Sequence, residues 1–180
     1  EHSPVVPARE QPGPKSVGNG LTFPRNLVGW AELHAGVTEL ADEVAVRLRG
    51  HGLKCTTLQV TIRDPNFKDI CRQKRLSAPT YVARELTETA MELIRAAWRE
   101  NAPVRALTLT AQALVEEGEA GEQLDLFAAG AAPRRDKLEK LEKAMDGIRG
   151  KFGRDAIAPA STVHRDRAEV KAEQRLPPVD

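Results

Sequence analysis

A helical stripe of apolar residues in the first third of the chain limits most strongly what this sequence can fold into. Its members recur at steps of three and four residues and are Trp30, Leu33, Val37, Leu40, Val44 and Leu48. This spacing places all six on one side of an α-helix. Gly50 and Gly52 follow and are typical of a helix end. The sequence therefore predicts an amphipathic helix that covers an apolar surface formed elsewhere in the chain.

Alternating residues predict the strands that form this surface. Leu58, Val60 and Ile62 alternate with polar residues before a turn at residues 64–66, and residues 104–114 alternate in the same way. Residues 17–23 predict an earlier strand, with a glycine-mediated bend or bulge at Gly18 to Gly20. Residues 68–76 predict the hairpin partner of the strand at 58–62. Apolar and charged residues of this segment fall on the same alternate positions, so the sequence leaves open which side chains face the core.

A second helix and the order of the elements complete the predicted fold. Apolar residues with helical spacing run from Val82 to Ala97, Thr80 is the expected N-cap, and the helix should end near Asn101. The order is strand, helix, strand, strand, helix, strand. It predicts an α+β fold of the ferredoxin-like βαββαβ type, in which two helices cover one face of a four-stranded antiparallel sheet. The other face is left to solvent or to a ligand.

The length of the chain allows one ordinary domain with tails. The chain has 180 residues, of which 41% are apolar and 29% are charged. Composition divides it into a Pro-rich linker at residues 1–14, a folded domain at 15–116, an acidic linker at 117–133, a charged helix at 134–152 and a disordered polar tail at 153–180. The helix is expected to dock on its own domain, to be solvated or to form a short coiled coil through its stripe of Leu138, Leu141, Met145 and Ile148.

Charge and cysteine content restrict the compartment more than the partner. The net charge is +1, from 27 Lys and Arg against 26 Asp and Glu, so total charge predicts neither a nucleic-acid nor a membrane partner. No apolar run approaches a membrane span, and the start resembles neither a signal peptide nor a natural N-terminus, so we expect a soluble fragment. Cys55 and Cys71, the two cysteines, predict a reduced intracellular protein. The spacing of histidines and cysteines predicts no structural zinc.

The predicted open side of the sheet and the hairpin carry polar and cationic residues. The open side is expected to hold Thr57, Gln59, Thr61, Arg63, Thr108, Thr110 and Gln112. The hairpin adds Arg63, Lys68, Arg72, Lys74 and Arg75 against Asp64 and Asp69, a surplus of three positive charges. Phosphate oxygens complement such a surface. A merely solvated face is the alternative, and a reader of single-stranded RNA is disfavoured because the central strands hold no aromatic residue.

The acidic segment at residues 116–127 ends in a short apolar cluster. The segment holds five acidic residues, four of them before Leu124, and Leu126 and Phe127 follow closely. An extended segment of this kind is typical of a docking peptide, which inserts alternate side chains into a partner. The alternative is that Leu124 and Phe127 pack back on the domain.

Several segments together resemble the bacterial Y-family DNA polymerase IV, a translesion polymerase. Residues 15–23, 62–68 and 104–107 are similar to its little-finger domain, and residues 123–127, Gln-Leu-Asp-Leu-Phe, resemble its sliding-clamp-binding pentapeptide. The resemblance extends over roughly residues 15–152. It implies a βαββαβ unit whose open sheet lies along the major groove of the primer–template duplex and grips phosphates without reading sequence.

The resemblance also implies functional residues. The DNA contacts are Lys15, Ser16, Arg63, Arg72, Lys74 and Arg75, with main-chain amides near Gly18 and Gly20, and the clamp contacts are Gln123, Leu124, Leu126 and Phe127. The catalytic carboxylates and their magnesium ions belong to a palm that these residues do not contain, so we expect no cofactor and no polymerase activity in this chain alone. The parent would be a monomeric nucleotidyltransferase of the bacterial cytoplasm acting in DNA damage bypass.

Two alternatives of other classes stay open at this point. One is a free-standing, non-catalytic adaptor or repair factor that binds the clamp and DNA. The other is an open face that binds protein, in which case binding would depend only weakly on salt.

Overall fold

The computed structural model describes residues 13–118, 132–153 and 156–157. Its elements are β1 (Ser16–Leu27), α1 (Trp30–Gly50), β2 (Leu53–Arg63), β3 (Asp69–Thr80), α2 (Ala83–Ala97), β4 (Val104–Glu116) and α3 (Ala132–Phe152). Most of the predicted linker, the predicted clamp-binding segment and nearly all of the predicted tail lie outside the described residues.

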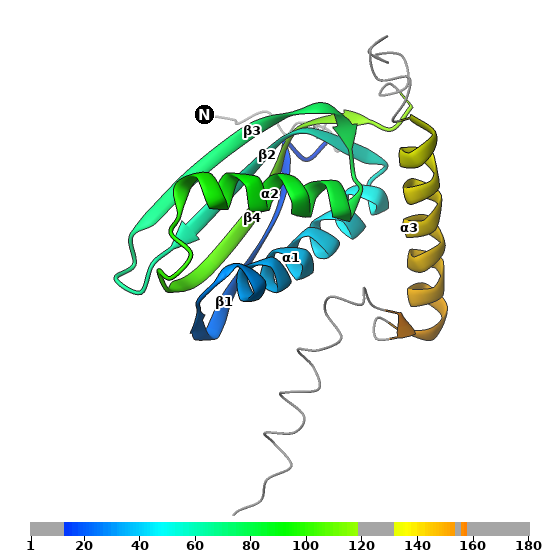
Figure 1. The fold of residues 1–180 in the computed structure, drawn as a ribbon. Helices are drawn as coiled ribbons and strands as arrows, with labels where there is room; N and C mark the ends of the chain where they lie inside the picture. Colours follow the sequence, from blue (N-terminus) through cyan, green and yellow to red (C-terminus); the bar gives the residue numbers. More distant parts are fainter. Residues whose placement is uncertain (1–12, 119–131, 154–155, 158–180) are drawn as a thin grey trace, which may run out of the picture.

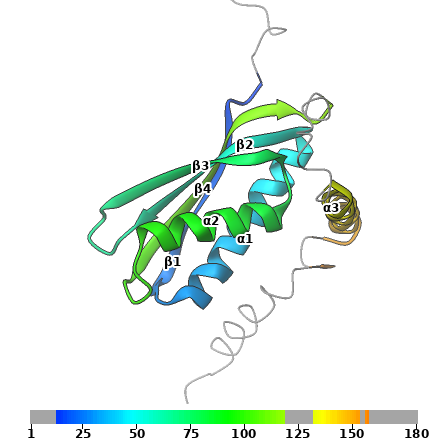
Figure 2. The same cartoon turned by 45° about the horizontal axis from the view of Figure 1, so that its top comes forward.

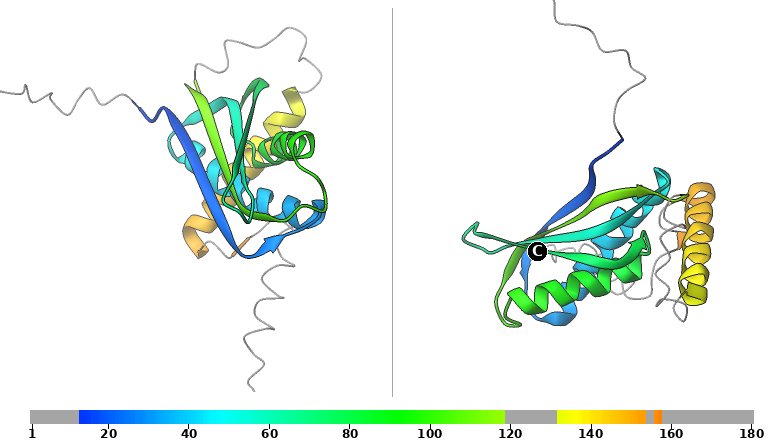
Figure 3. Two further views of the ribbon diagram at one scale, coloured as in Figure 1. Left: turned by 90° about the vertical axis from the view of Figure 1, so that its left-hand side faces the viewer. Right: turned by 90° about the horizontal axis from the view of Figure 1, so that it is seen from above.

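The four strands form one antiparallel sheet in the order β1-β4-β2-β3. α1 and α2 lie side by side on one face of this sheet (Figures 1 and 3). Within the described part of the chain, no helix covers the other face. The predicted fold class is confirmed, and the last strand, β4, lies in the interior of the sheet between β1 and β2.

The core lies between the sheet and these two helices. Ten aliphatic side chains from α1, β2 and β4 are at most 2% exposed: Leu33, Val37, Leu40, Val44, Leu48, Leu58, Val60, Ile62, Leu107 and Leu109. Burying each of them contributes about 1.5–3 kcal/mol relative to leaving it exposed. The residues of the apolar stripe predicted for the first helix therefore pack against the apolar residues of the two alternating strands and form one core with them.

The glycines of β1 permit close packing and do not form a bulge. β1 pairs with β4 in one unbroken register over residues 16–22, so the predicted bulge at Gly18 to Gly20 is wrong. A Cβ on Gly20 would lie 2.9 Å from the hydroxyl oxygen of Thr108, and one on Gly18 would lie 3.0 Å from that of Thr110. Both separations are shorter than ordinary van der Waals contact, so any larger residue would push the neighbouring threonine aside.

The pairing of β3 with β2 settles which way the hairpin faces. Arg72 lies opposite the buried Val60, whereas Arg75 lies opposite Thr57. Directly opposed residues of an antiparallel pair share a face of the sheet. The helix side therefore receives Ile70, Arg72 and Lys74, and the open side receives Cys71, Gln73 and Arg75. The register is continuous over residues 69–75 and then shifts between Arg75 and Thr80.

α2 begins later and ends earlier than the sequence predicts. Thr80 is the last residue of β3, and its hydroxyl accepts a hydrogen bond from the amide of Val82 without capping the helix. The first helical amide, that of Ala83, instead donates to the carboxylate of Glu142 in α3, at 2.9 and 3.1 Å from the two oxygens. A side chain 59 residues further along the chain thus caps α2, and local sequence patterns do not reveal such a cap.

α3 lies across the ends of α1 and α2 (Figures 1 and 2) and is held by charged side chains. Its ion pairs with the domain are Lys54–Glu139, Arg49–Glu142, Arg49–Asp146, Arg135–Glu85, Lys143–Glu117 and Arg149–Asp42. Within the predicted apolar stripe only Leu138 packs against the core, while Leu141 is 56% exposed. The docked alternative is confirmed, but a charged flank makes the contact.

Arg49 is the central residue of this docking contact. Its side chain is 5% exposed, pairs with both Glu142 and Asp146, and donates to the main-chain oxygen of Tyr81 at 3.2 Å. Burial raises the pKa of Glu142 to about 7, although the charge of Arg49 and the amide of Ala83 act in the opposite direction. Buried ion pairs hold elements together when the remaining hydrogen-bonding groups are also satisfied, as they are around Arg49.

We predict that the docking of α3 weakens as the pH rises. Docking raises the pKa of Glu142 from its ordinary value of 4.5 to about 7, so the docked state binds more protons than the undocked state between these pH values and loses stability across that window. Hydrogen-exchange protection of the α3 amides, corrected for the intrinsic exchange rate, should be lower at pH 8 than at pH 5.

Glu142→Gln should remove most of this pH dependence. Asp136→Asn is the matched control, because Asp136 lies on the exposed side of the same helix, and it should leave the dependence unchanged. Protection that stays constant or increases between pH 5 and pH 8 in the unaltered protein contradicts the prediction.

Candidate nucleic-acid interface

The face of the sheet opposite the helices is a polar surface built from alternate residues of all four strands. The strand registers align its residues in four rows across the sheet. Read from β1 through β4 and β2 to β3, the rows are Ser16-Gln112-Thr57-Arg75, Gly18-Thr110-Gln59-Gln73, Gly20-Thr108-Thr61-Cys71 and Thr22-Ala106-Arg63-Asp69. We call this surface the open face. It consists mainly of hydroxyl and amide side chains, and its sixteen positions include no aromatic residue.

The alternation of β2 and β4 places polar residues at the centre of the open face, where the sequence predicts them. Gln59 and Gln112 join the two central strands, since the Gln112 amide donates to the Gln59 carbonyl oxygen at 2.9 Å. Thr61 and Thr108 lie opposite each other in the third row. The threonines have short side chains and the two glutamines are hydrogen-bonded to each other. Together these residues offer both donors and acceptors of hydrogen bonds at the centre of the open face.

Cationic residues border the first row at both edges of the sheet. Lys15 directly precedes Ser16 at the start of the edge strand β1, and Arg75 lies on the opposite edge strand, β3. All three residues are exposed. Because neighbouring strands are about 4.8 Å apart, the two edges lie roughly 14 Å from each other. The row therefore has positive charge near both ends and neutral polar groups between them.

Arg63 lies in the fourth row and is paired with an acidic neighbour. Its Nε and Nη2 donate to the two carboxylate oxygens of Asp69 at 2.7 and 2.8 Å. The hydrogen bond from Arg63 holds the pKa of Asp69 below its ordinary value. Asp69 therefore offsets the charge of Arg63 on the open face. The alternation of side chains along β3, counted from its pairing with β2, is the feature that puts Asp69 on this face.

The structure does not bring the remaining predicted cations of β3 to this face. Lys74 lies on the helix side, where its Nζ donates to both carboxylate oxygens of Glu92 in α2 at 2.7 Å. Arg72 also lies on the helix side and donates to the main-chain oxygen of Cys71 at 2.8 Å. On or beside the open face are Lys15, Ser16, Gly18, Gly20, Arg63 and Arg75.

Two exposed glycines leave part of the open face as bare main chain. Gly18 and Gly20 are both exposed on the edge strand β1. The main-chain oxygen of Gly18 accepts a hydrogen bond from Arg47 of α1 at 2.9 Å. Because neither glycine carries a side chain, a ligand can approach the backbone closely at these two positions.

The turn between β2 and β3 is tightly hydrogen-bonded and exposes an aromatic ring. The carboxylate of Asp64 accepts hydrogen bonds from the amides of Asn66 and Lys68 at 2.8 and 2.9 Å. Phe67 has a φ of 63° and its side chain is 71% exposed. The sequence predicts the turn itself, but no local pattern indicates the exposure of Phe67.

Two hollows of the described surface lie on the helix side. The larger one, about 330 Å³, lies between β3, α2 and the start of α3, and it shares Glu85, Glu88 and Arg135 with its neighbour of about 240 Å³. Its charged side chains are largely paired, as in Arg135–Glu85 and Arg84–Glu88. Among the described residues, no three His, Cys, Asp or Glu side chains gather as a possible metal site, and no helix is long and apolar enough to cross a membrane.

Comparison with known proteins identifies the family. A model described as the impB/mucB/samB family C-terminal domain matches residues 14–126, more than half of the chain. The chain belongs to this family. Its sequence is 35% identical to DNA polymerase IV of Acetivibrio thermocellus over 139 residues, covering 77% of this chain and 34% of that protein. The resemblance predicted from the sequence is thereby confirmed.

Other relatives of this impB/mucB/samB family chain agree. DNA polymerase IV of Oceanobacillus iheyensis is 36% identical over 143 residues, covering 79% of the chain and 33% of the relative. That of Bacillus velezensis is 32% identical over 157 residues, covering 87% and 37%. The chain thus spans about a third of the length of the curated relatives it matches. The predicted clamp contacts Gln123, Leu124, Leu126 and Phe127 lie outside the described residues.

We predict that the two cysteines report the orientation of β3. Cys71 is exposed on the open face, whereas Cys55 is buried and burial raises the pKa of its thiol to about 12. Because the thiolate is the reactive form, iodoacetamide should modify Cys71 in the folded protein and Cys55 only after unfolding. Peptide mass spectrometry locates the label, and Cys71→Ser is the control. Rapid modification of Cys55 in the folded protein contradicts this assignment.

Proposed function

We propose that the open face binds the primer–template duplex without reading its sequence, as the C-terminal part of a translesion DNA polymerase. The observation that carries this proposal is the polar floor bordered by Lys15 on one edge and Arg75 on the other. Family membership supports it, because relatives at 32–36% identity are named DNA polymerase IV. By this proposal the protein is a monomer that acts in the bacterial cytoplasm.

The dimensions of the open face suit duplex DNA. The two cationic edges lie roughly 14 Å apart, and the major groove of B-DNA is about 12 Å wide between its phosphate backbones. Lys15 and Arg75 can therefore contact the phosphates on the two sides of one groove. Main-chain groups at Gly18 and Gly20 and the hydroxyl of Ser16 add hydrogen bonds along one edge.

The chemistry of the open face favours contact with the backbone over contact with bases. Contacts to phosphates position a protein on the duplex and carry little sequence information. Reading of base edges depends on side chains that make two hydrogen bonds to one base, such as an unpaired arginine or asparagine in the groove. The longest central side chains here, Gln59 and Gln112, are instead hydrogen-bonded to each other. A polymerase that copies damaged templates benefits from a grip that depends on charge and shape.

The ion pair of Arg63 with Asp69 sets how much charge the face presents. Phosphates must compete with the carboxylate of Asp69 for the Arg63 guanidinium, which reduces the contribution of Arg63 to binding. We include Arg63 and Arg75 in the proposed interface. Arg72 and Lys74, which lie on the helix side, are left outside it.

Nucleotidyl transfer is assigned to another part of the polymerase. That reaction needs carboxylates that hold two metal ions, and the described residues gather no three potential ligands. The described residues therefore do not form a magnesium site. The proposed role of the chain is to hold DNA and to attach the polymerase to its partner.

We further propose that residues 123–127 attach the polymerase to the sliding clamp. Gln123 would occupy a small polar subsite, and Leu124, Leu126 and Phe127 would fill an apolar pocket. The chain leaves the domain close to this segment, because the amide of Glu117 still donates to the main-chain oxygen of Gly52 at 2.9 Å. The acidic residues around Glu117 would repel DNA phosphates and keep this segment away from the duplex.

We predict a salt-dependent affinity for duplex DNA that increases when Arg63 is released. In anisotropy titrations with a labelled primer–template duplex, log affinity should fall linearly with log salt at a slope of about 3 to 5, and unrelated duplex sequences should bind equally. Asp69→Asn should strengthen binding and steepen the slope by about 1. Arg75→Ala should weaken binding.

Glu88→Gln is the matched control for Asp69→Asn. It makes the same change of charge in an exposed ion pair, that of Glu88 with Arg84, but on α2 at the far side of the sheet, so affinity should stay constant. Lys74→Ala controls Arg75→Ala in the same way. Equal effects on both faces, or no binding at low salt, would rule out the open face as the DNA site.

We predict that clamp binding and DNA binding are separable. Replacing both Leu126 and Phe127 by alanine should abolish binding to a purified bacterial sliding clamp, since it removes most of the apolar surface of the segment. The same variant should bind duplex DNA unchanged. Surface plasmon resonance on immobilised clamp measures the first effect and anisotropy measures the second. Unaltered clamp affinity in the double variant would refute the assignment of this segment.

A further inference from the structure

α3 carries an apolar seam that the domain covers only in part, since Leu138 packs against the core and Met145 is half-buried. Its members are Leu138, Leu141, Met145, Ile148 and Phe152, at steps of three, four, three and four residues. These steps are those of the a and d positions of a coiled coil. Leu141 is 56% exposed, Ile148 39% and Phe152 75%, although large apolar side chains in a continuous row are normally covered.

The docking contact of α3 explains why the seam is left uncovered. The acidic residues Glu139, Glu142 and Asp146 all pair with Lys54 or Arg49 of the domain. Each of these acids directly follows a residue of the seam. It therefore lies about a quarter turn around the helix from the seam, since successive residues of a helix are 100° apart. The ion pairs therefore fix the helix with its charged flank inward and its apolar seam to one side.

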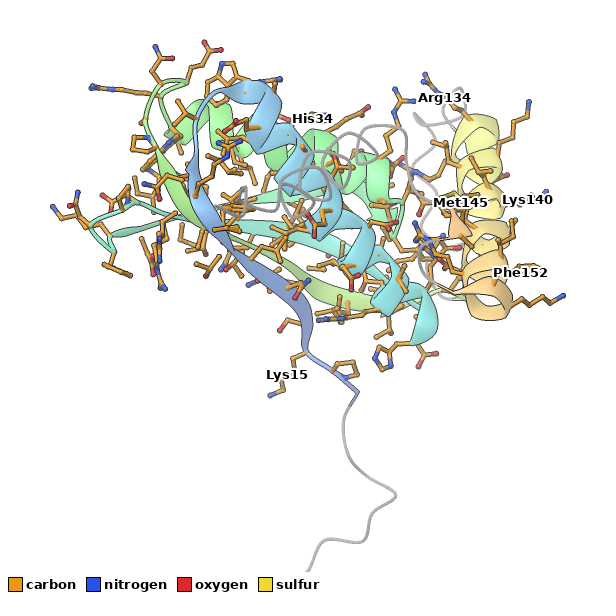
Figure 4. All side chains as sticks on the ribbon, turned by 90° about the horizontal axis from the view of Figure 1, so that it is seen from below. Lys15, His34, Arg134, Lys140, Met145 and Phe152 are labelled. Carbon is orange, nitrogen blue, oxygen red and sulfur yellow. The ribbon has the colours of Figure 1, made fainter. Side chains whose placement is uncertain are left out.

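Docking leaves several cations of α3 exposed, although Arg135, Lys143 and Arg149 pair with acids of the domain. The exposed charged residues include the cations Arg134, Lys137, Lys140 and Lys151 and the acid Asp136. Within the described part of the chain, no ion pair involves Lys137, Lys140 or Lys151. Figure 4 marks Arg134, Lys140, Met145 and Phe152 along the helix, with Lys140 directed away from the domain.

We propose that this seam is a docking surface for an acidic amphipathic helix of a partner protein. Apolar residues of the partner would pack against Leu141, Ile148 and Phe152. Acidic residues beside them would pair with Lys137 and Lys151, which occupy the g positions flanking the seam. The partner is therefore defined by its chemistry: an apolar heptad stripe with carboxylates on the side that faces α3.

A second copy of this chain fits the seam less well. In an antiparallel pair of α3 helices, g positions face g positions, and lysines would oppose lysines at Lys137 and Lys151. In a parallel pair, Lys137 would need Glu142 of the other copy, and Glu142 is already bound by Arg49 and the amide of Ala83. Charge thus favours a partner of different sequence.

The fixed position of α3 makes the seam a ready binding surface. Helices in proteins owe most of their stability to tertiary packing, and the ion pairs with the domain supply such contacts to α3 without the partner. A partner helix then orders only itself on binding, which lowers the entropic cost. The contact would cover about two heptads, so moderate affinity is expected.

Two synthetic helical peptides provide the test. Both carry leucine at a and d over about three heptads, with glutamate at e and g in the acidic peptide and lysine in the basic one. In anisotropy titrations with the full chain, the acidic peptide should bind about tenfold or more tightly than the basic one, and added salt should weaken binding. Leu141→Ser with Phe152→Ser should abolish it.

Charge reversal distinguishes the proposed pairing from general stickiness. Lys137→Glu with Lys151→Glu should transfer the preference to the basic peptide, while Arg95→Glu, an exposed change on α2, should have no effect. Circular dichroism and thermal unfolding verify that each variant is folded. Absence of binding, equal binding of both peptides, or a dimer of the chain in sedimentation that the serine variant dissociates would overturn the proposal.

Discussion

The antiparallel pairing of β2 with β4 is the interaction on which the rest of the structure depends. Its register sets Val60 opposite Leu109 on the helix side and Thr61 opposite Thr108 on the open side. A slip of one residue would exchange the two faces and expose the core. The apolar surface beneath the helices and the polar open face are therefore two consequences of one register, and neither can change without the other.

A second constraint acts at the end of the helical layer, where Arg49 is buried between carboxylates. A guanidinium in that position is tolerated only if Glu142 and Asp146 accompany it, because an unpaired buried charge is costly. The contact ties the last described helix to the domain and caps α2 through Glu142. It also turns Glu142 and Asp146 of α3 inward, whereas Lys137, Lys140 and Lys151 of the same helix stay exposed.

The fold was predictable because its signals are local and repeated. The helical spacing from Trp30 to Leu48 predicts which face of that helix is buried, and the alternation from Leu58 to Ile62 does the same for a strand. The order of the helices and strands then favours one topology. The predictions fail where a distant part of the chain supplies the deciding contact. The sequence predicts a bend or bulge at Gly18 to Gly20, whereas these glycines make room for the threonines of β4. Thr80 was assigned as a cap, although a distant glutamate caps the helix.

Residue spacing and short motifs are enough to predict the helices and strands, the fold class and the family. Which cations share a surface depends instead on the folded arrangement of the strands. Arg72, Lys74 and Arg75 lie close together in sequence, yet β3 sends Arg75 to one side of the sheet and the other two to the other side. Folding also brings Asp69 to Arg63 and α3 to Arg49. Side-chain direction and long-range pairing depend on strand register and packing, which spacing along the chain alone does not specify.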